Sequence, residues 1–226
     1  MATAGPGTTK RTMGGVTADE RRRRRRTRLL DAALELFTAN RYATVTVDLV
    51  CQAASVSTKS FYADFANKEE LFIELYDELI QRAKEAVLTV DLTGLGEDAR
   101  TRARLAAFVH ACVDDPRVAR ICFLEAPGLT AAVDARRRAV HHEFATYVEG
   151  LAGPYVAAGR VPPSGQYRLG AVAVVGAINE VIIDWVLDPD PAPVEAVIDG
   201  LADFVGLVRA PVTGNQPVSR GATEAT

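Results

Sequence analysis

Apolar residues recur at helical spacing along most of the chain. Leu30, Ala33, Leu34 and Phe37 lie three or four positions apart and therefore share one face of a first helix. No segment shows the strict apolar/polar alternation of a half-buried strand. The sequence thus predicts an all-α fold of about nine helices. After the first helix, the expected helices span residues 47–54, 58–65, 68–90, 103–113, 118–125, 131–158, 166–187 and 194–208.

The two ends of the chain lack any apolar period. Residues 1–20 and 209–226 are rich in small and polar residues, and such segments bury too little apolar surface to order themselves. We therefore expect a disordered arm and a disordered tail. Between them we expect two domains, at residues 21–70 and 71–208. With 48% hydrophobic residues the chain can bury a sizeable core.

Charge is distributed unevenly along the chain. The formal net charge is -3, which by itself argues against a general nucleic-acid binder. The first 68 residues, however, contain 12 basic and 6 acidic side chains, whereas the remainder contains 14 and 23. A basic head on an acidic body indicates that only the head faces a polyanion.

Cysteine content and hydropathy indicate a soluble cytoplasmic protein. Cys51, Cys112 and Cys122 are odd in number and form no CxxC pair, which is typical of buried thiols in a reducing compartment. The arginine run is not followed by an apolar segment with a cleavage site, so no signal peptide is predicted. The most apolar stretch, residues 169–187, contains an amide and two carboxylates. We therefore expect no membrane span.

Residues 46–71 contain two short helices joined by a tight turn. Thr46 is placed to cap the first of them. We expect the inward face of that helix to carry Leu49, Val50 and Ala53.

The connection between the two helices is Ser-Val-Ser, at residues 55–57. It supplies a small residue, a core valine and then a hydroxyl cap, Ser57, for the second helix. Phe61 and Phe65 of that helix can face the core. This is a helix-turn-helix arrangement, whose second helix enters the major groove of DNA by its N-terminal end.

The residues of this segment resemble the tetracycline-repressor (TetR) family of bacterial regulators. The family pattern has a capping threonine, an alanine-rich helix, a Gly-Val-Ser turn, a recognition helix with a tyrosine, and a phenylalanine followed by Lys-Glu-x-Leu. The resemblance covers residues 25–75, and beyond them it rests on helix order and length. The matching residues are Ala33, Leu36, Phe37, Thr46, Ala53, Ala54, Ser55, Val56, Ser57, Phe61, Tyr62, Phe65, Lys68, Glu69, Glu70 and Leu71.

Three positions depart from the family pattern. Ser55 replaces the turn glycine, so a serine must adopt the left-handed backbone region. Arg41 stands where a glycine commonly precedes the aromatic residue. Asp64 stands where a histidine or tyrosine often touches the DNA backbone. Because phosphate repels a carboxylate, we exclude Asp64 from the DNA contacts.

The resemblance implies which side chains contact DNA. Hydroxyl, phenol and ammonium groups at helix N-termini bind phosphates, and lysine at guanine is the base contact with clear discriminating power. The expected contacts are Thr46, Tyr62 and Lys68 to phosphates, Thr58, Lys59 and Ser60 to base edges, and Ser57, Arg25 and Arg26 beside them.

The arginine run at residues 21–26, together with Arg28, has two interpretations. It can form an arm ahead of the first helix that follows the minor groove or the backbone of DNA. It can equally be a solvated basic segment without specific contacts.

The helices after residue 71 contain no catalytic signature: GxSxG, P-loop and HExxH patterns are absent. His141 and His142 are adjacent and point about 100° apart on a helix. We therefore expect no catalytic residue, no metal and no cofactor. A helical enzyme and a protein-interaction module without DNA binding are the alternatives, and the basic helix-turn-helix disfavours both.

The resemblance implies a small-molecule effector and a homodimer on a near-palindromic operator. The effector is expected to be lipophilic or aromatic and to release a repressor from DNA. Asn179 and Glu180 lie in apolar helices, where they can meet either the ligand or the dimer partner. Candidate pocket residues are Phe108, Cys112, Phe123, Phe144, Tyr147, Asn179, Glu180 and Trp185. Candidate dimer residues are Gly170, Ala173, Gly176, Ala177, Leu201 and Phe204.

Overall fold

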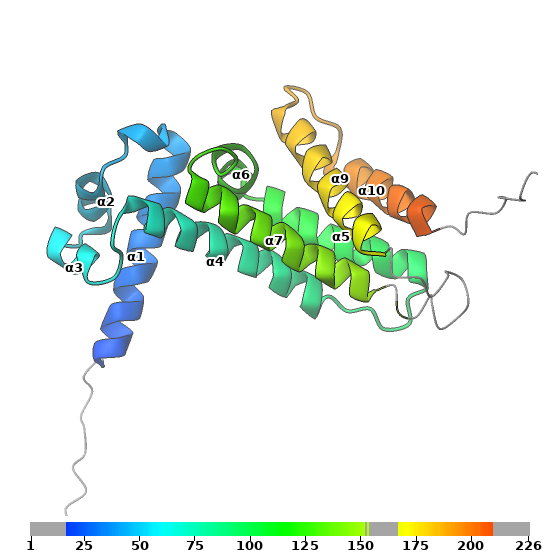
Figure 1. The fold of residues 1–226 in the computed structure, drawn as a ribbon, viewed down its shortest axis with the longest axis horizontal. Helices are drawn as coiled ribbons and strands as arrows, with labels where there is room; N and C mark the ends of the chain where they lie inside the picture. The colour runs from blue at the N-terminus through cyan, green and yellow to red at the C-terminus, as the bar shows by residue number, and fades with distance from the viewer. Residues whose placement is uncertain (1–16, 152, 154–166, 210–226) are drawn as a thin grey trace, which may run out of the picture. The chain divides into compact units, whose positions relative to one another are not determined.

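The computed structural model describes residues 17–151, 153 and 167–209 (Figure 1). Over these ranges the chain forms nine α-helices and no strand, which confirms the predicted all-α class. The helices are α1 (Ala18–Ala39), α2 (Val47–Ala54), α3 (Thr58–Tyr62), α4 (Lys68–Thr89), α5 (Glu97–Val113), α6 (Pro116–Ala119), α7 (Ala131–Gly150), α9 (Tyr167–Leu187) and α10 (Val194–Arg209). A 3-10 turn, η1 (Tyr42–Thr44), and a π-helical turn, η2 (Arg120–Glu125), complete the described elements.

The chain divides into two compact units, Met1–Leu75 and Tyr76–Thr226. The boundary between them lies within α4, the same helix in which the sequence placed the domain boundary. Most of the predicted arm, all but the first residue of the predicted tail and the end of the predicted helix 131–158 lie outside the described residues.

Helix α1 begins earlier than the sequence predicted. The Thr17 hydroxyl accepts a hydrogen bond from the backbone N–H of Glu20 at 3.1 Å, and the Glu20 carboxylate accepts one from the N–H of Thr17 at 2.7 Å. This capping box satisfies two of the N–H groups that a helix start leaves without partners. Residues 21–26 are therefore the first turns of α1, and the prediction of an arm ahead of the first helix is wrong for them.

Aromatic side chains fill the core of the first unit. Phe37, Phe61, Phe65 and Phe72 are all at most 1% exposed, which confirms the inward direction predicted for Phe61 and Phe65. The rings of Phe37 and Phe72 meet edge to face with centroids 5.3 Å apart, a favoured geometry for aromatic pairs. Helix α1 packs on α2, and α2 packs on α3.

The inward face of α2 differs from the prediction. Val50, Cys51 and Ala54 are buried, whereas Leu49 is 44% exposed and Ala53 is also exposed. At 100° per residue, positions 50, 51 and 54 form one continuous stripe, and the turn at Ser55 selects that stripe. The prediction for Leu49 and Ala53 is therefore wrong.

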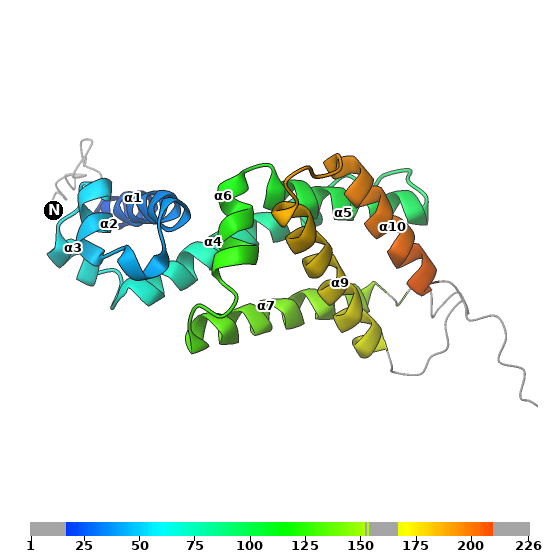
Figure 2. The same cartoon turned by 90° about the horizontal axis from the view of Figure 1, so that it is seen from above.

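In the second unit, α7 packs against α9, α5 packs against α10, and η2 contacts α9. Figures 1 and 2 both show α9 and α10 side by side. The core of this unit is aliphatic, with Val109, Ile121, Val133, Val140, Ile182 and Ile198 each at most 1% exposed.

Helix α9 is apolar on faces that its own chain does not cover. Its buried residues are Ala171, Val174 and Ile182, whereas Leu169 is 76% and Leu187 is 63% exposed. Burial of α9 is therefore incomplete within one chain, although the helix is apolar on several faces. Among the described helices it alone is long and apolar enough to cross a membrane, but it carries acidic side chains that membrane spans rarely expose.

Candidate DNA interface and effector pocket

The turn between α2 and α3 adopts the conformation that the sequence required of a serine. Ser55 has φ 52° and ψ 47°, which is the left-handed region. It is the only described residue other than glycine with a positive φ. The N–H of Val56 donates to the carbonyl of Cys51 at 2.9 Å. This left-handed cap ends α2 sharply and sets the direction of α3.

Helix α3 presents a polar surface at its N-terminal end. The Ser57 hydroxyl caps it by accepting from the N–H of Ser60 at 3.2 Å, and the two serine hydroxyls lie 2.9 Å apart. Thr58 donates its hydroxyl to the Asp48 carboxylate at 3.1 Å. Lys59 is exposed, and Tyr62 is 57% exposed. Lys59 and Tyr62 are thus the longest side chains that α3 offers to a partner.

Thr46 lies at the start of α2, where its hydroxyl accepts from the N–H of Leu49 at 3.2 Å. The residue is exposed, and the side chain fixes the N-terminal turn of α2. The N–H groups at this helix end carry the partial positive charge that attracts phosphates.

Lys68 has an internal role rather than the free ammonium that the sequence led us to expect. Its Nζ donates to the carbonyls of Tyr42 and Val45, each at 2.7 Å, and lies 4.1 Å from the centroid of the Tyr42 ring. Burial lowers the pKa of Lys68. Two of its three N–H donors are used inside the unit, so Lys68 joins the η1 segment to α4 and has one donor left for DNA.

Arg25 and Arg26 likewise bind inside the first unit. Arg22 and Arg25 pair with the Asp64 carboxylate at 2.8 and 2.5 Å. Arg26 donates to the Asp64 carbonyl at 3.0 Å and pairs with Glu74. Its guanidinium also stacks on the ring of Phe65, 4.5 Å from the ring centroid. We call Arg22, Arg25, Arg26 and Asp64 the arginine clasp. It occupies the guanidinium groups that were predicted to touch DNA.

Asp64 is the acceptor at the centre of the arginine clasp. Its side chain is fully shielded from solvent. Burial raises the pKa of Asp64, but hydrogen bonds and charges from Arg25 and Arg22 outweigh burial and hold the pKa below its usual range. The carboxylate that was excluded from phosphate contact thus anchors α1 to the residues that follow α3.

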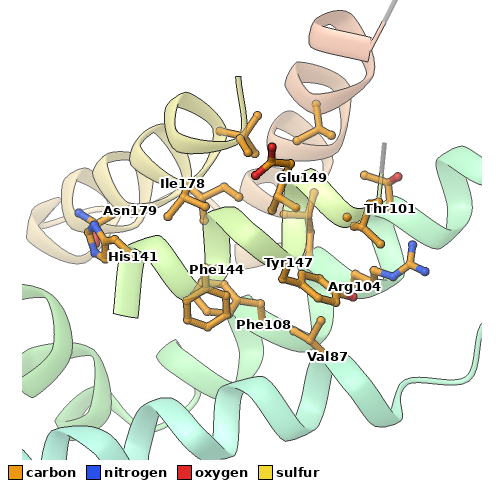
Figure 3. Close-up of a pocket in the computed structure, with 18 of the residues that line it drawn as sticks. Val87, Thr101, Arg104, Phe108, His141, Phe144, Tyr147, Glu149, Ile178 and Asn179 are labelled. Atoms are coloured by element: carbon orange, nitrogen blue, oxygen red, sulfur yellow. The ribbon is translucent and has the colours of Figure 1, made fainter. Parts of the chain in front are cut away.

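The second unit contains a cavity of about 450 Å³ (Figure 3). Residues from α4, α5, η2, α7, α9 and α10 line it. In its middle, Phe108 of α5 and Phe144 of α7 meet edge to face with ring centroids 5.3 Å apart. The size and the mainly apolar lining are typical of a small-molecule site.

Five of the eight predicted pocket residues line this cavity: Phe108, Phe123, Phe144, Tyr147 and Asn179. The other three do not.

Cys112 is buried in the core, where burial raises the pKa of its thiol to about 12. Glu180 is exposed. Trp185 donates its indole N–H to the carbonyl of Ala192 at 2.7 Å, so it fixes the connection between α9 and α10.

Most polar residues of the cavity wall were not predicted from the sequence. Arg100 and Arg104 come from α5, and Tyr167 comes from the start of α9. His141 pairs with Asn179 in the wall; burial, followed by the charges of Arg137 and His142, lowers the His141 pKa.

A signal for these groups was present in the sequence. Positions 97, 100, 101, 104, 105 and 108 form one stripe of α5, which holds both charged and aromatic residues. A helix face that combines charged and aromatic residues does not fit a purely apolar core, so it indicates a pocket wall.

The predicted dimer residues occupy two environments. Ala173 and Gly176 are exposed, Ala177 is half-buried and Phe204 is 36% exposed. Beside them on α9 and α10, Leu169 and Leu207 are 76% and 75% exposed. By contrast, Gly170 lines the cavity and Leu201 is only 3% exposed. Leu201 is therefore packed within its own chain, and Gly170, a residue without a side chain, borders the cavity; the dimer contact itself stays a prediction.

Comparison with known proteins agrees with this geometry. Residues 29–75 match the sequence profile of the bacterial regulatory proteins of the tetR family. The uncharacterized HTH-type transcriptional regulator YhgD of Bacillus subtilis (strain 168) is 40% identical over 57 residues, which are 25% of this chain and 30% of that protein.

Two longer matches extend beyond the helix-turn-helix. The fatty acid metabolism regulator protein of Bacillus subtilis (strain 168) is 20% identical over 185 residues, 78% of this chain and 91% of that protein. The structure of the transcriptional regulator FadR from Bacillus subtilis in complex with stearoyl-CoA has a TM-score of 0.67 at 18% identity, covering 79% of this chain and 96% of that one.

A helix-turn-helix unit followed by a helical unit with its own cavity is the architecture of a two-domain regulator. The profile match at residues 29–75 and the fold shared with FadR over 79% of the chain support a transcriptional regulator of the TetR family.

Proposed function

We propose that this protein is a homodimeric transcriptional repressor that binds a near-palindromic operator in the cytoplasm and leaves it when a lipophilic molecule enters the cavity. One observation carries the proposal: helix α4 contributes Lys68 to the helix-turn-helix unit, and Tyr76, Ile80 and Val87 to the cavity wall. A ligand that moves this wall acts on a helix that the DNA-binding unit shares.

DNA binding is assigned to the N-terminal end of α3 and the start of α2. Lys59 and Tyr62 are exposed there, and Ser57, Thr58 and Ser60 fix the shape of the helix end. Lysine at a guanine edge contributes about 1–3 kcal/mol of base discrimination. Tyr62 and Thr46 are assigned to phosphates, which position the unit on DNA.

The arginine run retains a limited role in this proposal. Arg23 and Arg24 are exposed on α1. Neither side chain forms an ion pair or hydrogen bond with another residue of the described ranges. We assign them a general attraction to phosphates, which salt screens.

A second copy of the chain is the proposed cover for the apolar face of α9 and α10. Leu169, Val172, Phe204 and Leu207 are 36–76% exposed on these two helices. A two-fold dimer through this face presents two copies of α3, as a near-palindromic operator requires.

A lipophilic effector fits the apolar middle of the cavity. The relative from Bacillus subtilis that was solved with stearoyl-CoA supports this assignment, because it carries an acyl compound on the same fold. Binding that prefers one dimer geometry by about 1–3 kcal/mol lowers operator affinity by about 5–150-fold.

The test of DNA recognition is a mobility-shift titration with duplexes selected from the DNA that flanks its gene. We expect the double variant Lys59→Ala/Tyr62→Ala to lose at least about tenfold in affinity, because it loses a base contact and a phosphate contact. Arg138→Ala, which removes an exposed arginine from α7, is the control and retains binding.

Two results would contradict DNA recognition by α3. One is unchanged binding by the double variant. The other is the absence of any preferred duplex in a selection from random sequences, which would favour a protein-interaction module instead.

A further inference from the structure

We propose that the effector is an amphiphile with an anionic head group, bound by Arg104, Arg100 and Tyr167, and with its apolar tail between Phe108 and Phe144. This inference rests on the proposed function and specifies the chemistry of its ligand. It follows from two buried donors and one cation for which the described residues supply no partner, and from the position of the apolar surface.

Two polar atoms in the cavity wall have no hydrogen-bond partner. The Nε of Arg100 and the hydroxyl oxygen of Tyr167 are buried, and no described residue bonds to either. Both residues line the cavity. An unsatisfied buried polar group costs about 1–3 kcal/mol, so such groups are rare in native proteins. Because a guanidinium N–H can only donate, the missing partner is a hydrogen-bond acceptor.

The charges around these atoms leave a positive excess. Glu97 pairs with Arg100 at 3.5 Å. Glu149 pairs at 3.7 Å with Arg168, which lies outside the cavity lining. Both carboxylates of the lining thus already have cationic partners.

Arg104 lacks a counter-ion among the described residues. It is half-buried in the same wall, and its side chain forms no ion pair or hydrogen bond with any of them. A half-buried cation without a counter-ion favours an anionic ligand.

Apolar surface begins next to the arginines. Leu105 follows Arg104 on α5, and Phe108 lies one turn further along the helix. Figure 3 shows Arg104 on one side of Phe108 and Phe144, and His141 with Asn179 on the other. His141 and Asn179 form a hydrogen bond with each other, so this end of the cavity does not require a polar group on the ligand. One charged end followed by apolar walls matches a carboxylate on an alkyl chain.

Binding of three probes with the same C12 chain tests this inference. Isothermal titration calorimetry with the full chain would compare dodecanoate, dodecanol and dodecanoyl-CoA below their aggregation concentrations. We expect dodecanoate to bind wild type about tenfold more tightly than dodecanol, the gain of a charge-assisted hydrogen bond. Dodecanoyl-CoA, which has no free carboxylate beside the chain, is expected to bind more weakly than dodecanoate.

Variants assign the preference to residues. Arg104→Met removes the charge while keeping much of the apolar stem, and we expect it to lose most of the preference for the acid over the alcohol. Tyr167→Phe removes only the hydroxyl and is expected to reduce the preference without loss of fold, which the thermal unfolding midpoint checks. Arg138→Met removes an exposed arginine outside the cavity lining and should keep the wild-type preference.

The outcomes separate this inference from the proposed function. If dodecanol binds wild type as tightly as dodecanoate and still releases DNA, the repressor proposal stands and the anionic head group is overturned. Retention of the acid preference by folded Arg104→Met also overturns it. Equal or tighter binding of dodecanoyl-CoA, which carries phosphates but has no free carboxylate, overturns a carboxylate beside the chain as the group that the arginines bind. If none of the probes binds a protein that still binds DNA, the lipophilic effector itself is refuted.

Discussion

At the scale of single residues, Asp64 joins α1 to the segment that follows α3. Its buried carboxylate binds Arg22 and Arg25, and its carbonyl accepts from Arg26. These bonds hold the N-terminal half of α1 against the segment that follows α3. The exposed Arg23 and Arg24 of the same turns therefore have fixed positions relative to α3.

We predict that Asp64→Asn lowers the free energy of unfolding by about 1.5–3 kcal/mol, the value of hydrogen bonds to charged groups. The loss should lie near the lower limit, because Arg22 is 57% exposed and water screens its charge. Urea unfolding measures it. Asp31→Asn, an exposed position on the same helix, is the matched control. Equal stability of the two variants would contradict a structural role for the arginine clasp.

The pH dependence of this effect has a defined sign. The pKa of Asp64 is lowered in the folded state. Its stabilising contribution is therefore complete above about pH 4, the ordinary value for aspartate, and is lost as the pH falls through the lower folded pKa. The difference between wild type and Asp64→Asn should be constant from pH 7 to about pH 5 and shrink below pH 4. A difference that grows on acidification would contradict this assignment.

Sequence reasoning succeeded at this scale where the cause is local. The left-handed backbone of Ser55 was predicted because this serine stands where the family pattern has a turn glycine. The partners of Arg25 and Arg26 could not be predicted, because Asp64 lies 38 or 39 residues away and nothing nearby specifies that pairing. The same holds for Lys68, which binds carbonyls 23 and 26 residues earlier.

At the scale of helices, periodicity predicted well which helices exist and in what order. It predicted less well which face of each helix is buried. Helices α4 and α10 begin at or beside the predicted positions. The start of α1 was missed, although Thr17 and Glu20 have the spacing of a capping box. The π-helical turn η2, which brings Phe123 to the cavity, has no simple periodic signature. On α9, Gly170 lines the cavity whereas Ala173 and Gly176 are exposed, a division that periodicity alone does not predict.

The face of α9 and α10 makes the next prediction. Leu207→Glu places a charge in an apolar contact that occurs twice in a two-fold dimer, so the two copies repel each other. We expect the dimer dissociation constant to rise at least about 100-fold, as measured by sedimentation equilibrium. Leu88→Glu on α4, where the leucine is 67% exposed, is the control and should remain dimeric. Dissociation by both variants, or by neither, would place the interface elsewhere.

At the scale of the whole molecule, the two units share helix α4. The proposed function requires that ligand binding in the cavity changes DNA binding through this helix. The fold class and the helix-turn-helix could be predicted from the sequence, because local patterns determine them. The cavity could be predicted only in part, because six elements from distant parts of the chain line it. Most of its aromatic residues follow from the sequence, whereas the Tyr167 hydroxyl and the Arg100 Nε, to which no described residue bonds, required the three-dimensional arrangement.

The most direct test of the account is a fluorescence-anisotropy titration of operator DNA at increasing dodecanoate or dodecanol, with wild type and Gly170→Leu. Gly170 lines the cavity, and a Cβ there meets nothing within 4 Å, so leucine can extend into the space of the ligand. Both proteins should bind DNA equally without ligand. The account predicts that the ligand weakens binding by wild type about 5–150-fold and leaves Gly170→Leu unchanged. Equal release of both proteins, or release of neither, would contradict it.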